Sequence, residues 1–205
     1  MPATAFENKE IRYAYDSIHE FFDSYGLGSA IQRMESVLKA SLGDKAWKKA
    51  DPYSLLYFMQ KLEALCGAAF MIHFNCSTRA GAIVKEPQNG DAGMLQKQHL
   101  IGGQSPRTEW HYFPRSLTAG QYCNPCKAIK KFVVCMTEPE WKNAISTITE
   151  FALRNDSINN EDYPCNVLTL RRRLLQLIEG CYLLDIRTNM QNQPNTKQQT
   201  KKIKK

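Results

Sequence analysis

The sequence has no long uncharged hydrophobic run. Its most apolar stretch, residues 64–72, covers nine residues, whereas a helix needs about 20 residues to span a bilayer. The N-terminus becomes polar and charged within eight residues and lacks the apolar segment of a secretory signal. We therefore expect neither a membrane span nor export.

The chain also lacks the short motifs of several enzyme classes. It contains no HExxH and no Gly-x-Ser-x-Gly motif, and Gly102-Gly103 is not followed by the Lys-Ser or Lys-Thr of a phosphate-binding loop. These absences exclude zincin metalloproteases, hydrolases with a nucleophile elbow and P-loop nucleotidases. We expect a non-catalytic interaction or accessory protein that needs no cofactor.

A regular disulfide framework is missing as well. The seven cysteines are an odd number and have irregular spacing. Cys66 and Cys181 lie within apolar helical patterns, where a free cysteine behaves as a small hydrophobic residue. This usage is typical of a reducing compartment, so we expect a cytoplasmic protein.

Acidic residues are absent after Asp185, and this changes how the net charge is read. The chain has 27 basic and 20 acidic residues, a net charge of +7, but without five lysines in the last nine residues the basic count is 22. We expect this tail to give weak, salt-sensitive attraction to nucleic acid. Its lysines are Lys197, Lys201, Lys202, Lys204 and Lys205.

Apolar residues recur at steps of three and four along much of the chain, which predicts amphipathic helices. Thr137 and Glu140 form a capping-box pair at the start of one helix. The helix from residue 51 has apolar residues around most of its circumference and should be the central one. We predict an all-α antiparallel bundle of five or six helices. The expected ranges are 11–25, 31–42, 51–72, 124–136, 137–152 and 163–184.

Residues 75–122 interrupt this pattern. They hold six of the eleven glycines and show no sustained periodicity, so we predict a long irregular insertion that contacts a protein partner. The expected organisation is a single helical-bundle domain over residues 1–187 that contains this insertion. A disordered basic tail should follow over residues 188–205.

Aromatic and arginine side chains gather near the end of the insertion. Rings interleaved with arginine stack on nucleic-acid bases or anchor protein partners, so specific RNA or DNA binding is an alternative function. The competing interpretation is that the rings fold back onto the bundle core. The candidate binding residues are Arg107, Trp110, His111, Tyr112, Phe113 and Arg115.

Cys123-Asn124-Pro125-Cys126 precedes a predicted helix and resembles the C-x-P-C active site of thioredoxin-like proteins. The alternating strands and helices of that fold are absent, and Pro125 is explained by helix initiation. The same cysteines, with the H-x2-C pair His73 and Cys76, match the Cys3His ligand set of a structural zinc site. The alternative is free thiols and a histidine at helix ends.

Arg12 and His19 lie seven residues apart on the first predicted helix, nearly on one face. This spacing resembles the Arg-x4-6-His motif of HEPN ribonucleases, which are small helical bundles that often dimerise. The resemblance implies a metal-independent ribonuclease or toxin in which Arg12 binds the scissile phosphate and His19 transfers protons, and it implies a homodimer. The alternative is that both residues are solvated.

Three consecutive arginines, Arg171 to Arg173, interrupt the last apolar helix. Because consecutive helical residues point about 100° apart, at least one of them should lie beside the bundle. We expect that arginine to pair with an acidic residue such as Glu63 or Glu150.

Overall fold

The computed structural model describes residues 5–48, 50–74, 113–160 and 166–192, and within these ranges it contains helices and no strands. The predicted all-α bundle is confirmed. Its α-helices are α1 (Ala5–Ser24), α2 (Leu27–Ser41), α3 (Pro52–Phe74), α4 (Ala119–Cys123), α5 (Cys126–Val133), α6 (Glu138–Leu153) and α7 (Val167–Asn192), and a short 3-10 helix, η5 (Ile158–Asn160), follows α6.

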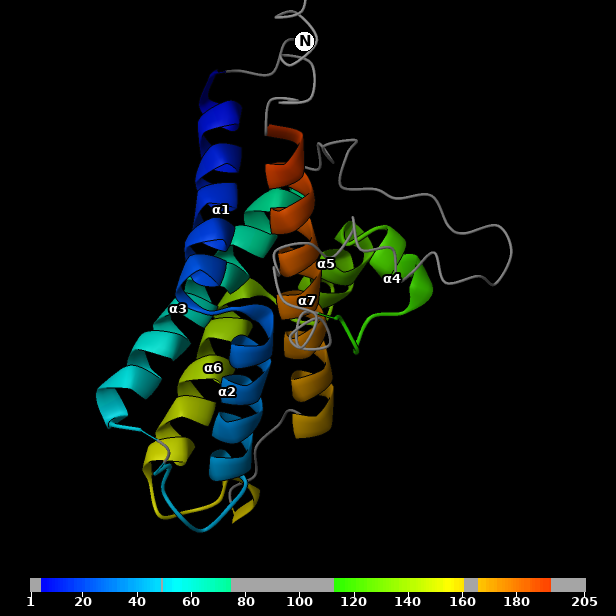
Figure 1. Ribbon diagram of the computed structural model, residues 1–205. Helices are drawn as coiled ribbons and strands as arrows, with labels where there is room; N and C mark the ends of the chain where they lie inside the picture. Colours follow the sequence, from blue (N-terminus) through cyan, green and yellow to red (C-terminus); the bar gives the residue numbers. More distant parts are fainter. Residues whose placement is uncertain (1–4, 49, 75–112, 161–165, 193–205) are drawn as a thin grey trace, which may run out of the picture.

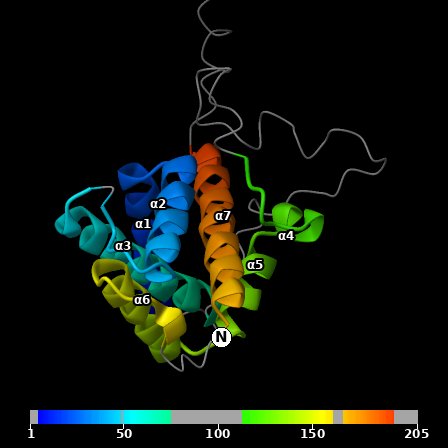
Figure 2. The same ribbon diagram turned by 90° about the horizontal axis from the view of Figure 1, so that it is seen from below.

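Helices α1 and α2 run in one direction, and α7 runs in the other (Figure 1). Helices α1 and α2 follow one another along α7 and run opposite to it, since His19 of α1 contacts Asp185 and Glu35 of α2 pairs with Arg171. Helix α3 packs mainly against α1 and α6. Seen from below, α7 lies between α2 on one side and α5 with α4 on the other (Figure 2).

Side-chain caps fix several helix starts. The Asp51 carboxylate accepts a hydrogen bond from the Ser54 amide ahead of α3, and the Asn166 side chain accepts from the Leu168 amide ahead of α7. The predicted capping box of Thr137 and Glu140 is present at the start of α6. These contacts satisfy amides that have no partner within the first helical turn.

The central helix is α7, and the prediction that the helix from residue 51 would be central was wrong. Every residue from 174 to 184 is buried. Helix α3, in contrast, leaves Tyr53, Met71 and Phe74 exposed on its outer side. Both helices are rich in leucine, so composition alone did not separate them.

Two aromatic contacts join the short helix α5 to the core. The Phe132 ring stacks on Trp141 of α6 at a centroid distance of 4.1 Å, and the Trp141 indole donates a hydrogen bond to the Phe132 carbonyl. The Phe132 ring also meets Phe70 of α3 edge to face. Helix α5 is thereby fixed between α3, α6 and α7.

Two boundaries differ from the predicted ones. Helix α4 lies within the segment expected to be irregular, where Thr118 and Gln121 form a second capping box. Helix α7 continues to Asn192, so the expected tail boundary after Arg187 is five residues too early. Thr188 is buried in this last part of α7, which explains why the helix continues.

Gly180 allows α5 to approach α7 closely. A Cβ atom at this position would lie 3.1 Å from the Ala128 side chain and 3.5 Å from the Pro125 carbonyl oxygen. At Gly67 of α3 the nearest atom would be a Glu138 carboxylate oxygen at 3.8 Å, so there is room for a methyl group.

We expect Gly180→Ala to lower the free energy of unfolding by about 1 kcal/mol or more, because the added methyl group separates α5 from α7. Gly67→Ala should raise it by roughly 0.5–1 kcal/mol, because alanine favours the helix. Urea unfolding of both variants measures the two effects. Equal stabilisation by both substitutions would contradict the close contact at Gly180.

Candidate functional site

The described end of the predicted contact segment packs along one side of α7. The buried Glu179 carboxylate accepts hydrogen bonds from the backbone amides of Arg115 at 2.8 Å and Ser116 at 2.7 Å. One turn earlier, the buried Gln176 side chain donates to the Ser116 carbonyl oxygen at 3.0 Å. Polar groups of α7 therefore hold this segment through its backbone.

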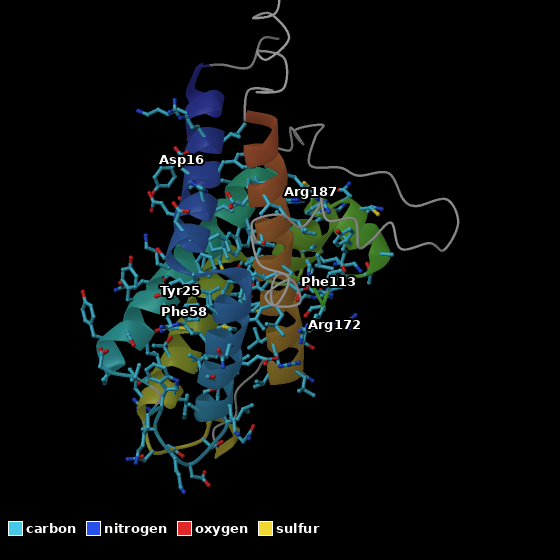
Figure 3. The ribbon with its side chains drawn as sticks, viewed as in Figure 1. Asp16, Tyr25, Phe58, Phe113, Arg172 and Arg187 are labelled. Atoms are coloured by element: carbon cyan, nitrogen blue, oxygen red, sulfur yellow. The ribbon has the colours of Figure 1, made fainter. Side chains whose placement is uncertain are left out.

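Helix α4 is held near the other end of α7. The Arg187 guanidinium donates to the Tyr122 carbonyl oxygen at 2.8 Å and lies over the Tyr122 ring. Tyr122 and Cys123 form a second small hydrophobic cluster with Leu183. Figure 3 shows Phe113, Arg172 and Arg187 on the side of α7 that faces α4.

Burial raises the pKa of Glu179, because removal from water disfavours the charged carboxylate. The hydrogen bonds from the amides of Arg115 and Ser116 act in the opposite direction but are the smaller effect. The carboxylate that holds the 113–118 segment is thus itself destabilised by its surroundings.

All charged side chains on the surface of this segment, of α5 and of the start of α7 are basic. Residues 113–137 contain four basic residues and no acidic one, and residues 166–178 contain three arginines and no acidic one. We call this surface the basic face. It comprises Arg115, Lys127, Lys130, Lys131, Arg172 and Arg173.

Contacts place these residues on adjoining elements. Lys127 reaches α4, since its Nζ atom lies 3.6 Å from where a Gly120 Cβ would be. The Arg173 guanidinium donates to Gln176, which in turn bonds Ser116, the neighbour of Arg115. Lys130 and Lys131 continue along the exposed side of α5.

The lysines of the basic face contrast with two lysines on the opposite side of the bundle. Within the described ranges, Lys127, Lys130 and Lys131 are exposed and form no ion pair with an acidic side chain. On the α1, α3 and α6 side, by contrast, Lys61 pairs with Glu20 at 3.2 Å and Lys142 pairs with Glu138 at 3.0 Å. Two lysines on that side thus have acidic partners, whereas the three lysines of α5 have none among the described residues.

Two of the predicted binding residues lie within the described chain. The Phe113 ring is half-buried and stacks on Tyr122 at a centroid distance of 6.4 Å, which occupies one face of the ring. The Arg115 side chain is exposed beside the basic face. The other candidates, Arg107, Trp110, His111 and Tyr112, and the five tail lysines lie outside the described residues.

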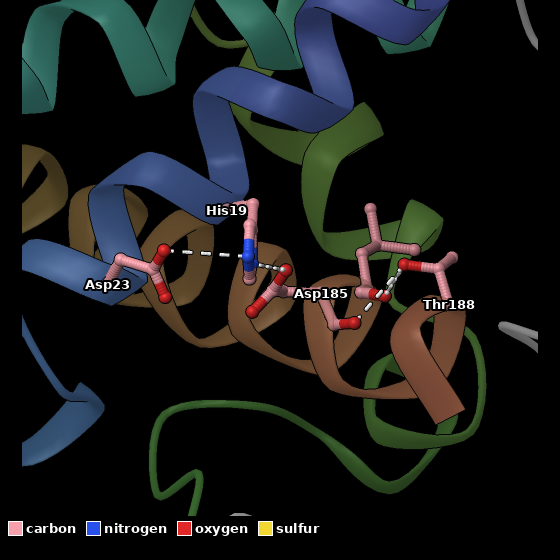
Figure 4. Close-up of polar contacts among 5 residues, drawn as sticks. His19, Asp23, Asp185 and Thr188 are labelled. Atoms are coloured by element: carbon pink, nitrogen blue, oxygen red, sulfur yellow. Dashed lines mark hydrogen bonds and ion pairs between the residues drawn. The ribbon is translucent and has the colours of Figure 1, made fainter. Parts of the chain in front are cut away.

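His19 joins α1 to α7 (Figure 4). Its Nδ1 atom lies 3.1 Å from the Asp185 carboxylate, and its Nε2 atom lies 3.5 Å from Asp23. Arg12 is two turns away on the same stripe of α1 and pairs with Asp16 at 3.9 Å. Within the described residues, each member of the predicted catalytic pair thus contacts its own carboxylates.

These carboxylates have a chemical consequence for the HEPN interpretation. Asp16, Asp23 and Asp185 line the stripe on which Arg12 and His19 lie. Three negative charges beside one arginine repel the phosphate that a ribonuclease must bind. The geometry favours an interhelical contact over a catalytic pair.

Three of the four proposed zinc ligands are described, and they do not gather. Cys123 packs with Tyr122 and Leu183, whereas Cys126 packs against the main core. His73 lies beside the Phe74 ring at the end of α3. Among the described residues no three His, Cys, Asp or Glu side chains form a metal-binding group, and Cys76 lies outside these residues.

The arginine run at the start of α7 pairs differently from the prediction. Arg171 contacts Glu35 of α2, and Glu150 pairs with Arg154 within α6. The expected partners Glu63 and Glu150 were wrong because helix periodicity does not identify the neighbouring helix. The sequence did contain a signal for α4, since Thr118 and Gln121 have the capping-box spacing.

No family model matches the chain, and no curated protein or solved structure is significantly similar to it.

Glu179 should make stability depend on pH. Because its pKa is raised in the folded protein, the fold retains a proton that the unfolded chain releases just above the ordinary glutamate pKa of about 4.3. Relative to the neutral Glu179→Gln variant, the wild-type protein should lose stability as pH rises from the ordinary glutamate pKa to the raised pKa that Glu179 has in the folded protein. Urea unfolding of both proteins from pH 4 to 7 measures this; a difference that is constant or grows in favour of wild type with pH would contradict it.

Arg12 and His19 should contribute unequally to stability. His19→Ala removes a hydrogen bond to Asp185, whose side chain is only 12% exposed, and should cost about 1 kcal/mol. Arg12→Ala removes an exposed pair within one helix and should change stability by less than about 0.5 kcal/mol. Thermal unfolding compares the variants, and incubation with single-stranded RNA provides the functional control: RNA cleavage by wild type that either substitution abolishes would restore the HEPN interpretation.

Proposed function

We propose that this chain is a non-catalytic, cytoplasmic accessory protein that binds nucleic acid through its basic face and its lysine tail. The observation that supports it best is the uncompensated positive charge of Lys127, Lys130 and Lys131 in a part of the chain without acidic residues. The tail extends the same charge, since all five of its lysines follow the last acidic residue.

The composition of the basic face suits phosphate contacts. Lysine carries a compact charge on a flexible side chain, and arginine offers a planar fork that matches phosphate oxygens. Such contacts release counterions and make affinity fall steeply with salt, while they read little sequence. The packing of Phe113 on Tyr122 makes that ring a support for α4 and leaves base contacts to other residues. We therefore propose binding with low sequence preference.

The backbone docking of residues 113–118 supports this assignment. Because Glu179 and Gln176 bind main-chain groups, the Arg115 side chain stays exposed next to Arg172 and Arg173. The only acidic side chain of α7 near this surface is buried, so it adds no exposed negative charge. A polyanion would meet a surface of one sign.

Reversing three charges on the basic face should weaken binding. We expect Lys127→Glu/Lys130→Glu/Lys131→Glu to reduce affinity for a fluorescent 20-nucleotide RNA at least tenfold at 100 mM salt, and to flatten the dependence of log affinity on log salt by about two units. Fluorescence anisotropy between 50 and 300 mM salt gives both quantities. Truncation after Asn192 should cause a further, additive loss.

A matched control separates position from net charge. Lys39→Glu/Lys45→Glu/Lys48→Glu changes the same total charge at the end of α2 and in the connection to α3, where all three lysines are exposed. It should leave affinity within about threefold of wild type. If both triple variants lost affinity equally, net charge and not the basic face would explain RNA binding. If truncation alone abolished RNA binding, the tail would be the binding element.

A further inference from the structure

Helix α3 presents an uncharged stripe along its whole outer side. Its members recur at alternating steps of four and three residues, the spacing of a helix surface that meets another helix. The two ends are the most exposed, with Tyr53 at 77% and Phe74 at 74%. We call this set the α3 stripe. It consists of Tyr53, Tyr57, Gln60, Ala64, Gly67, Met71 and Phe74.

The α3 stripe borders two shallow grooves. The groove toward α6, about 400 Å³, is lined by Leu56, Gln60 and Ile145 among others. The second groove, about 350 Å³, crosses the middle of the stripe at Ala64 and Gly67 and has Tyr13 of α1 and Lys142 of α6 in its walls. Tyr13 is 64% exposed, so the apolar surface extends from α3 onto α1.

Charged pairs border this surface on both sides. Lys61 and Glu20 pair on the α1 side, and Lys142 and Glu138 pair on the α6 side. An apolar centre with a polar rim is the usual composition of a protein–protein interface. An apolar surface of this extent on a small domain is uncommon unless something covers it.

The order of residues along the α3 stripe identifies its occupant. In a two-fold symmetric dimer the same surface is used twice, so contacts are reciprocal. If two copies of α3 cross antiparallel at Ala64, Tyr53 faces Phe74 of the second copy, Tyr57 faces Met71, and Gln60 faces Gly67. Large residues thus meet at both ends, a sulfur meets an aromatic ring, and a long side chain meets a glycine.

We propose that the chain forms a homodimer in which the α3 stripes of two copies pack antiparallel about a two-fold axis at Ala64. The small side chain of Ala64 lets the helix backbones approach closely at the crossing, while the aromatic ends close the interface. This proposal concerns a different surface from the basic face and does not depend on nucleic-acid binding.

The exposed side chains supply most of the area that such a dimer needs. Tyr13, Leu56 and the four large members of the α3 stripe together expose on the order of 600 Å² per copy, since a full aromatic side chain offers roughly 200 Å². A standard interface buries about 800 Å² per partner. Gln60, Ala64, Gly67 and the polar rim supply the remainder.

One charged residue lies close to the proposed axis. Glu63 neighbours Ala64, so its carboxylate would lie near that of the second copy. Lys142, which bonds Glu138, lies in the same groove as Glu63 and is close enough to interact with it electrostatically. This ammonium group offsets the repulsion between the two carboxylates.

Cysteine cross-linking tests the antiparallel register. Ala64→Cys should form a disulfide-linked dimer under mild oxidation, because the two copies of residue 64 face each other. Tyr53→Cys alone should not, because its copies lie about 30 Å apart along the helix axis. A mixture of Tyr53→Cys and Phe74→Cys chains should cross-link. The parent chain under the same oxidant shows any cross-linking through native cysteines, and Tyr53→Cys linking to itself above that level would overturn the register.

Sedimentation equilibrium tests the dimer itself. Wild type should sediment at twice the chain mass of 23.5 kDa, and Tyr53→Lys/Phe74→Lys should be monomeric, because two lysines would meet at each end of the interface. Val134→Lys/Leu168→Lys introduces the same charge at Val134 after α5, which is 71% exposed, and at Leu168 of α7, which is 75% exposed, and should remain dimeric. Circular dichroism confirms that each variant is helical.

A membrane surface is the competing occupant. Among the described residues, α3 is the single helix long and apolar enough to cross a membrane, although more than half of its apolar window is buried in the bundle. A wild-type chain that is monomeric at 100 µM overturns the dimer, whether or not it floats with phosphatidylcholine vesicles. Dimerisation that both double-lysine variants abolish equally would also overturn the assignment to α3.

Discussion

The enclosure of α7 is the constraint on which the rest of the structure depends. A helix buried on all sides between residues 174 and 184 must satisfy every polar group that it carries there. Glu179 and Gln176 cannot reach water, and they bind the main chain of residues 115 and 116. The hydrogen bonds of Glu179 and Gln176 thus fix the main chain of the 113–118 segment. The Arg115 side chain makes no part of these bonds and remains at the surface.

The same arrangement gives the molecule two dissimilar sides. On the side of α4 and α5, close packing at Gly180 leaves the lysines of α5 directed away from the core. On the side of α1, α3 and α6, Lys61 and Lys142 are paired with carboxylates, and the stripe along the outer surface of α3 is uncharged. Figure 2 shows these two sides separated by α7. Two surfaces of different chemistry can therefore be occupied independently.

The sequence predicted helices better than it predicted their neighbours. Apolar spacing located α1, α2, α3 and α6, and the Thr137–Glu140 pair placed the start of α6 correctly. The central helix was misassigned because Glu179 and Arg187 count against burial in any hydropathy pattern, although both are buried. Their burial depends on partners 60 or more residues away. The basic face was missed because charge was counted over the whole chain: the run of residues 113–137 without an acidic residue is visible in the sequence, but its packing beside the arginines of α7 is visible only in the fold.

The position of α7 in the chain affects how the bundle can form during synthesis. Helix α7 follows every other described helix, yet it supplies the centre of the core. Contacts such as His19 with Asp185 join residues 166 positions apart. While the ribosome still holds α7, the inner faces of α1, α2 and α5 have no central helix to cover them. The nascent chain therefore exposes apolar surface until α7 emerges, and the core of the bundle closes only after α7 has been synthesised.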